Sequence, residues 1–252
     1  MKRALPLYAV ALYAFLHLPV MTLAVFSFNS SRFTVWEGFS LRWYAQAFRD
    51  PQLAEATWNS IVIALAATTL STAIGTLAAY GLWKRKSQWL TGTLYLSLVT
   101  PEIVMGVSLL AFFQFLFRWF HWQLGLHTVI MAHVAFSIAF VVIVVLARLR
   151  TFSVTLEEAA MDLGATEWGA FWRVTLPQLL PGIVAAGLLA LTVSFDDFVI
   201  TSMVAGVDSE TLPMVIYAMA RRGANPVINA ISAMITVLFG ALILVSERMR
   251  KA

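Results

Sequence analysis

Three carboxylates lie in stretches of the chain that are otherwise apolar. Asp196 and Asp197 follow each other in one such stretch, and Glu102 lies in another. An ionised carboxylate inside a lipid bilayer costs about 2.5–3.5 kcal/mol on insertion scales, so residues of this kind usually line a cavity. Three of them at one depth would repel one another unless a cation or protons compensated their charge. The pattern therefore predicts a path for a cation, with these three residues as its binding groups.

Each carboxylate also has a structural interpretation. The two aspartates could bond to a neighbouring helix or subunit, and Glu102 could cap a helix that restarts after Pro101, where a carboxylate is favourable. An acid–base dyad for hydrolysis is disfavoured, because adjacent residues on a helix point about 100° apart. A metal site is not expected, because the chain has no cysteine and its four histidines lack ligand spacing. We interpret His133, inside an apolar stretch, as a hydrogen-bonded interior residue.

The elements that carry these residues are predicted to be membrane helices. Of the 252 residues, 60% are hydrophobic and 12% are charged, whereas about 25% are charged in an average soluble domain. A helix that crosses the hydrocarbon layer needs about 20 mostly apolar residues. Six stretches qualify, and they cover residues 5–28, 58–83, 89–117, 128–147, 183–205 and 227–246.

These stretches predict an all-α membrane protein with six transmembrane helices. We expect a single transmembrane domain over residues 1–252, with a polar loop at residues 148–182 between helices four and five. The first stretch is interpreted as a retained helix, because it is longer than the apolar core of a signal peptide and no small-residue cleavage site follows.

The basic residues predict the orientation of this domain. With six spans both termini lie on one side, and most of the 17 lysines and arginines fall on that side or in the 148–182 loop. The positive-inside rule then places both termini and this loop in the cytoplasm. The basic residues lie at predicted membrane boundaries rather than on one soluble face, so nucleic acid is not an expected partner.

Small residues recur along the second predicted span. Ala67, Ser71, Gly75 and Ala79 follow one another at every fourth position, on one face of a helix. Small faces allow helices in a membrane to approach closely. We interpret this face as a packing surface.

The cytoplasmic loop has the pattern of two short helices joined by a turn. Acidic residues begin a helical stretch at Glu157, Gly164 ends it, Thr166 can cap the next helix, and Pro177 is predicted to break the return. A short exposed helix with apolar residues could insert into a groove on another protein.

The spacing in this loop resembles a known signature. The order Glu-Ala-Ala, three residues, Gly, nine residues, then Ile-x-Leu-Pro is typical of integral membrane permease subunits of binding-protein-dependent ATP-binding-cassette (ABC) importers, and here Val174 replaces the isoleucine. The resemblance implies that the loop forms a coupling helix that docks into an ATPase subunit. The residues assigned to that contact are Glu158, Ala159, Ala160, Gly164, Leu176 and Pro177.

Other segments are similar to the polyamine permeases within this family. They are Ser194–Thr201, Thr211–Pro213, Ile216–Tyr217 and Asn225–Ala230. The resemblance implies that spermidine or putrescine is the substrate, with permeases for iron or thiamine as alternatives. The predicted substrate path then comprises Asp196, Asp197, Glu102, Ser194 and Trp43.

The chain contains no Gly-x-x-x-x-Gly-Lys-Ser/Thr motif, so it is not expected to bind ATP by a P-loop or to be an enzyme. The resemblance implies a multi-pass subunit of the bacterial inner membrane that needs no cofactor of its own. Its expected partners are an ATPase dimer, a second permease subunit or another copy of this chain, and an extracytoplasmic binding protein. A secondary transporter driven by an ion gradient is the alternative from another class.

Overall fold

The computed structural model describes residues 4–33, 35–85, 87–223 and 225–251, all of them helical or in short connections apart from an isolated β-bridge between Asn29 and Phe39. Six of its helices are long and apolar enough to cross a membrane. The prediction of an all-helical membrane protein with six spans is therefore confirmed.

The chain forms two compact units, one from residues 1–55 and 215–252 and the other from residues 56–214. In the first unit α1 (Ala4–Phe26) and α2 (Arg42–Arg49) each pack against α12 (Pro226–Lys251). Helix α11 (Leu212–Arg221) connects the second unit to the first. The exposed surface of α1 is largely apolar, as lipid or another membrane helix requires.

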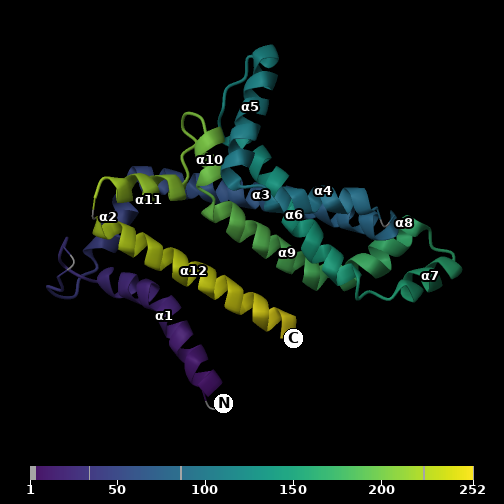
Figure 1. The fold of residues 1–252 in the computed structure, drawn as a ribbon, viewed down its shortest axis with the longest axis horizontal. Helices are drawn as coiled ribbons and strands as arrows, with labels where there is room; N and C mark the ends of the chain where they lie inside the picture. Colours follow the sequence, from purple (N-terminus) through teal and green to yellow (C-terminus); the bar gives the residue numbers. More distant parts are fainter. Residues whose placement is uncertain (1–3, 34, 86, 224, 252) are drawn as a thin grey trace. The chain divides into compact units, whose positions relative to one another are not determined.

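The second unit contains the predicted spans two to five and the loop between spans four and five. Its elements are α3 (Pro51–Arg85), α4 (Gln88–Val99), α5 (Glu102–Phe120), α6 (Leu126–Leu149), α7 (Val154–Asp162), α8 (Glu167–Ala170), the π-helix η1 (Phe171–Thr175), α9 (Leu176–Asp196) and α10 (Val199–Val204). Helices α6 and α9 pack along each other (Figure 1).

Two apolar clusters hold this unit together. One joins Tyr80 of α3 to Val142 of α6 and Leu179 of α9, near the 148–182 loop. The other joins Phe113 of α5 to Phe136 of α6 and Ile200 of α10. The small-residue face of α3 lies inside the unit, because Ala67, Ser71, Gly75 and Ala79 are all buried, which confirms its interpretation as a packing surface.

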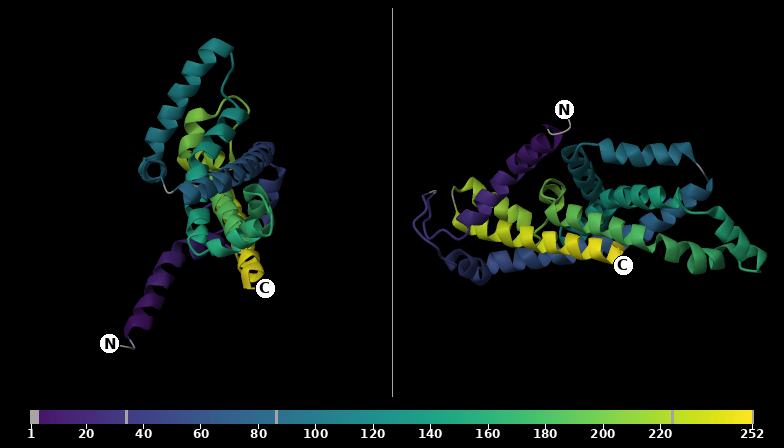
Figure 2. Two further views of the ribbon diagram at one scale, coloured as in Figure 1. Left: turned by 90° about the vertical axis from the view of Figure 1, so that its right-hand side faces the viewer. Right: turned by 90° about the horizontal axis from the view of Figure 1, so that it is seen from below.

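Two of the predicted spans are interrupted. The sequence predicts one helix over residues 89–117, but α4 ends at Val99 and α5 begins at Glu102. The two helices meet at a steep angle (Figures 1 and 2). The predicted span 183–205 is likewise divided between α9 and α10, with a break after Asp196. These breaks matter because all three intramembrane carboxylates lie at them.

The return from the 148–182 loop also differs from the prediction. Pro177 is expected to break the chain there, but it lies directly after the π-helix η1, and the helical segment continues through it into α9. Helix α8, η1 and α9 follow one another without interruption over Glu167–Asp196. The second half of the 148–182 loop is therefore the start of a long helical segment.

Candidate functional site

Pro101 determines where Glu102 lies. A proline has no backbone N–H and disfavours the helical conformation of the residue before it, and Thr100 is accordingly extended, with ψ 126°. Helix α4 ends there, and the chain turns into α5 with Glu102 as its first residue. This carboxylate therefore lies in the first turn of α5, where a negative charge is favourable, but the N-cap residue is Pro101 and no side-chain hydrogen bond caps the helix. The side chain of Glu102 is exposed.

Asp197 begins α10. Its backbone is extended, with ψ 124°, and its side-chain oxygens accept hydrogen bonds from the backbone N–H of Ile200 at 3.4 Å and of Thr201 at 2.7 Å. A carboxylate that accepts these otherwise unpaired N–H groups stabilises a helix start. Asp197 is therefore held by the backbone of the helix that follows it.

A close approach of α5 to α10 brings these two helix starts together. Gly106 of α5 is buried, and a Cβ added there would lie 3.1 Å from Met203 Cγ and 3.4 Å from Ile200 Cα of α10. The absence of a side chain at Gly106 lets the helices pack this closely. The close packing places the start of α5, with Glu102, beside the start of α10, with Asp197.

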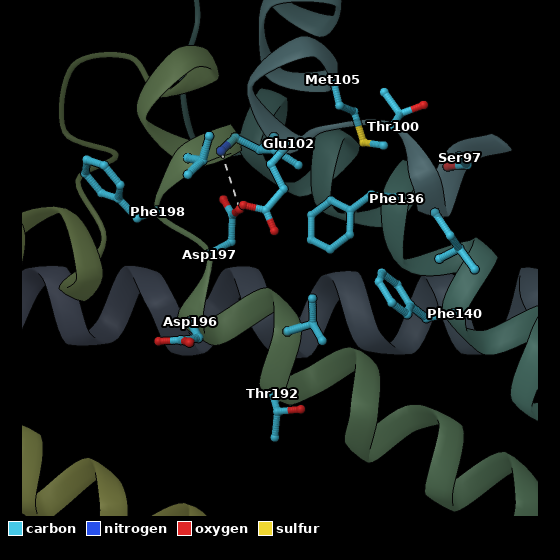
Figure 3. Close-up of a pocket in the computed structure, with 14 residues that line it drawn as sticks. Ser97, Thr100, Glu102, Met105, Phe136, Phe140, Thr192, Asp196, Asp197 and Phe198 are labelled. Carbon is cyan, nitrogen blue, oxygen red and sulfur yellow. Dashed lines mark hydrogen bonds between the residues drawn. The ribbon is translucent and has the colours of Figure 1, made fainter. Parts of the chain in front are cut away.

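The two helix starts border a cavity of about 460 Å³. Figure 3 shows Glu102 and Asp197 directed toward each other, with the ring of Phe136 beside them. Its lining residues are Ser97, Leu98, Thr100, Glu102, Met105, Phe136, Phe140, Thr192, Val193, Asp196, Asp197, Phe198, Val199 and Ile200. The cavity thus combines carboxylates with aromatic rings, two kinds of group that attract cations.

Behind Asp197 lies a buried hydrogen-bond network centred on His133 of α6. The ring contacts Ser194 Oγ through Nδ1 at 2.7 Å and Thr201 Oγ1 through Nε2 at 2.9 Å. The Thr201 hydroxyl donates to Asp197 Oδ2 at 2.7 Å. Because that hydroxyl has one proton to give, it accepts from His133 Nε2. The prediction that His133 is a hydrogen-bonded interior residue is confirmed.

The adjacent aspartates have different surroundings. Asp196 is the last residue of α9, and its exposed side chain points away from Glu102 and Asp197 (Figure 3). The side chain of Asp197 is only 6% exposed. The break after α9 thus gives the two adjacent carboxylates different surroundings.

Two further residues of the predicted substrate path lie elsewhere. Ser194 is buried and turned toward His133 rather than into the cavity. Trp43 belongs to the other compact unit, where its indole Nε1 donates to the backbone oxygen of Asn29 at 2.7 Å. Neither lines the cavity that contains the carboxylates.

The first half of the 148–182 loop folds as its sequence pattern predicts. Helix α7 ends at Asp162 with Leu163 as its C-cap, and Gly164 follows with a φ of +90°, a conformation that residues other than glycine rarely adopt. The N–H of Gly164 donates to Met161 O, and the N–H of Ala165 donates to Ala160 O, the paired bonds of a Schellman motif. Thr166 caps α8 by accepting from Gly169 N at 3.1 Å.

The signature residues of the loop fall into two groups. Glu158, Ala159 and Gly164 are exposed on α7 and its turn, and Ala160 is half-buried. Leu176 and Pro177 lie in the first turn of α9, after η1. The structure thus separates an exposed helix and turn from the point where the long helical segment of α9 begins.

The sequence did not predict that the first turn of α7 is bonded to other helices through Glu157. Glu157, next to the signature glutamate, is completely buried, and its carboxylate contacts Tyr80, Lys84 and Thr175. Nothing in the local pattern distinguishes Glu157 from Glu158, because the partners lie far away in the sequence. The one available signal was Lys84, a basic residue at the cytoplasmic end of a predicted span.

Comparison with known proteins agrees with the fold and the loop. Residues 71–252 match the protein family described as "Binding-protein-dependent transport system inner membrane component". The spermidine/putrescine transport system permease protein PotC of Escherichia coli (strain K12) is 36% identical over 244 residues, which cover 95% of this chain and 91% of that protein. The putrescine transport system permease protein PotI of the same strain is 40% identical over 237 residues, 91% of this chain and 83% of that protein.

A solved structure shares the fold. A chain from a bacterial ABC transporter that imports the acidic polysaccharide alginate superimposes with a TM-score of 0.77 at 18% sequence identity, over 99% of this chain and 96% of that one. The family match covers most of the sequence, including the 148–182 loop. This chain therefore belongs to the binding-protein-dependent transport system inner membrane components, and it is a multi-pass, non-catalytic permease subunit of an ABC importer in the inner membrane.

Proposed function

We propose that this permease carries a polyamine of the spermidine/putrescine class and that the cavity between α5, α6, α9 and α10 lies on the substrate path. The observation that carries the proposal is the pair of carboxylates, Glu102 and Asp197, directed toward each other beside Phe136 (Figure 3). A polyamine presents ammonium groups separated by methylene chains. The ammonium groups can pair with carboxylates, and the methylene chains can pack against aromatic rings. The names of the relatives at 36–40% identity point to the same substrates.

The carboxylates have different roles in this proposal. Glu102 is exposed at the start of α5 and binds an ammonium group directly. Asp197 adds negative charge from a fixed position, because α10 and His133 hold its side chain. Asp196, at the rim of the cavity, attracts the cation before it enters. Ser194 supports the path indirectly, because its hydrogen bond orients His133. Trp43 belongs to the other compact unit, and its place on the substrate path stays a prediction.

Helix α7 is the proposed docking helix for the ATPase. Glu158 and Ala159 are exposed on it, Ala160 is half-buried, and Gly164 shapes the turn that leaves Leu163 91% exposed. An apolar residue on an exposed turn, next to a carboxylate, fits insertion into a groove of another protein. Leu176 and Pro177 act at the joint between this region and α9 rather than in the contact itself.

The proposed cycle is alternating access. ATP closes an ATPase dimer on the cytoplasmic side, and α7 passes that movement to α9 and to the cavity. A binding protein delivers the substrate from the other side. The positive-inside rule supports cytoplasmic termini, since Lys84, Arg85 and Arg148 lie at helix ends next to the proposed docking helix. A second permease subunit, related or identical, completes the pathway.

Two alternatives make different predictions. A permease for iron or thiamine would share the loop but respond to another substrate. An ion-gradient-driven transporter is disfavoured by the family assignment, and it would transport without ATP. Both alternatives can be tested in one reconstituted system.

The experiment is uptake of radiolabelled spermidine and putrescine into liposomes that contain the complete transporter with its binding protein. We expect ATP-dependent uptake of a polyamine and at least a tenfold loss in Glu102→Gln, since one charge contact is worth roughly a factor of ten or more. The matched control is Glu55→Gln, which neutralises an exposed carboxylate outside the cavity. Uptake of iron or thiamine in place of polyamines, or full uptake by Glu102→Gln, would contradict the proposal.

A further inference from the structure

We propose that Glu157 is the positioning residue that transmits movement of the docking helix to the membrane helices. This inference rests on the proposed role of α7 as the ATPase docking helix. It concerns how the helix is fastened to the rest of the permease rather than how it contacts the ATPase.

Glu157 is unusual among the charged residues of the loop. It lies in the first turn of α7 and is 0% exposed, whereas its neighbour Glu158 is exposed. A buried carboxylate is costly unless it is paired and hydrogen-bonded. Both oxygens of Glu157 have partners, and all of these partners belong to other helices.

Two of the partners lie on α3. The Tyr80 hydroxyl donates to Glu157 Oε1 at 2.6 Å, and Lys84 Nζ lies 2.7 Å from the same oxygen. These residues are one helical turn apart near the C-terminal end of α3, a candidate membrane span. The short distances and the burial of Glu157 make this a charge-assisted contact that fixes the start of α7 to α3.

The third partner leads to α9. Thr175 Oγ1 donates to Glu157 Oε2 at 3.3 Å, and Thr175 is the last residue of η1, which continues directly into α9. Phe171 of η1 packs against the ring of Tyr80, with ring centroids 4.6 Å apart. One carboxylate therefore joins α7 to α3 and to the segment that extends, through α9, to the cavity.

This arrangement gives Glu157 a role that an apolar residue would not have. Apolar packing would hold α7 in place without a directional link, whereas the two oxygens of Glu157 each bind a different helix. A displacement of α7 by the ATPase is thus applied to α3 and α9 together. Removing one partner leaves a buried charge without compensation, which loosens α7 without altering its exposed surface.

The test measures how far movement of α7 reaches the cavity. It does so separately from binding of the ATPase and without added substrate. The chain has no cysteine, so Thr192→Cys, in the lining of the cavity on α9, introduces the permease's single labelling site for a fluorophore. The labelled permease is assembled with an ATPase free of cysteine. Fluorescence change on addition of ATP is compared for Glu157→Gln, Lys84→Met, the double variant and Tyr80→Phe.

We expect each single variant to reduce the ATP-induced change on the order of fivefold or more while the ATPase still co-purifies. The double variant should be no worse than the more severe of Glu157→Gln and Lys84→Met, because both remove the same link. Tyr80→Phe keeps the ring against Phe171 and removes only the hydroxyl. If either charge variant assembles poorly, this variant tests whether the hydrogen bond to Glu157 is needed for the ATP-induced change. A full ATP response in Tyr80→Phe together with either charge variant would overturn the inference.

Two controls separate this inference from the docking proposal. Glu167→Gln removes an exposed carboxylate 3.7 Å from Lys84, and it should respond to ATP like the parent. Glu158→Lys reverses the charge on the exposed face of α7 and should prevent co-purification of the ATPase. If the ATPase stays bound to Glu158→Lys, the docking proposal fails, and the response of Glu157→Gln still reports whether Glu157 transmits the movement.

Discussion

His133 Nε2 lies 3.4 Å from Asp197 Oδ2, and both side chains are almost completely buried. Thr201 bridges them, since its hydroxyl donates to the carboxylate and accepts from the ring. The pair ties α6 to the break between α9 and α10. The candidate cation cavity thus has one wall held by a polar network that sequence reasoning did not connect to it.

Removing the bridging hydroxyl tests this network. Thr201→Val keeps the size of the side chain but leaves Asp197 and His133 without their shared partner. We expect a loss of about 1–3 kcal/mol in stability, the usual cost of an unsatisfied buried polar group. Thermal unfolding of the purified transporter measures it. Thr69→Val is the matched control, because Thr69 is exposed on α3 and bonds only to its own helix; equal losses in the two variants would contradict the network's importance.

The two adjacent aspartates should respond differently to the same substitution. Asp197→Asn weakens the start of α10 and the contact with His133, so we expect both a lower unfolding temperature and much slower uptake. Asp196→Asn changes an exposed side chain, so stability should be nearly unchanged and uptake should fall only modestly. Comparison of the variants by thermal unfolding and by uptake checks this. Equal effects would mean that the break after α9 does not separate their roles.

Gly164 should tolerate asparagine better than alanine. Its φ of +90° costs most residues on the order of 1–2 kcal/mol, and asparagine is the residue other than glycine that adopts such a conformation most readily. No atom lies within 4 Å of a Cβ built there, so backbone strain rather than a clash sets the effect. We expect the amount of co-purified ATPase to be highest for the parent with Gly164, lower for Gly164→Asn and lowest for Gly164→Ala. An alanine variant that binds the ATPase like the parent would show that the turn can adopt another shape.

Gly75 should not tolerate even a methyl group. A Cβ there would lie 2.6 Å from Val141 Cγ1 of α6, whereas one at Gly81, on the same helix, meets nothing within 4 Å. Gly75→Ala should therefore cost about 1–3 kcal/mol through overpacking, and Gly81→Ala should be nearly neutral. Thermal unfolding of the two variants makes the comparison. A stable Gly75→Ala variant would mean that α3 and α6 can separate at little cost.

Much of the architecture follows from the sequence alone. Apolar runs of about 20 residues specify six membrane helices, because the thickness of the hydrocarbon layer leaves few alternatives. The small-residue face of α3 and the turn at Gly164 were also predictable, since each depends on the local periodicity or conformation of one segment. The loop signature identified the family for the same reason: its residues are close in the sequence.

The tertiary structure decided which polar residues act together. Asp196 and Asp197 look equivalent in the sequence, and the break after α9 gives them different surroundings. Glu157 and Glu158 also look equivalent, and only the packing of α7 against α3 buries one and exposes the other. A buried charge needs partners, and here the partners come from helices that are remote in the sequence. The sequence thus determined which charges are present in the membrane protein, and the packing of its helices determined which of them are held and which are free to bind.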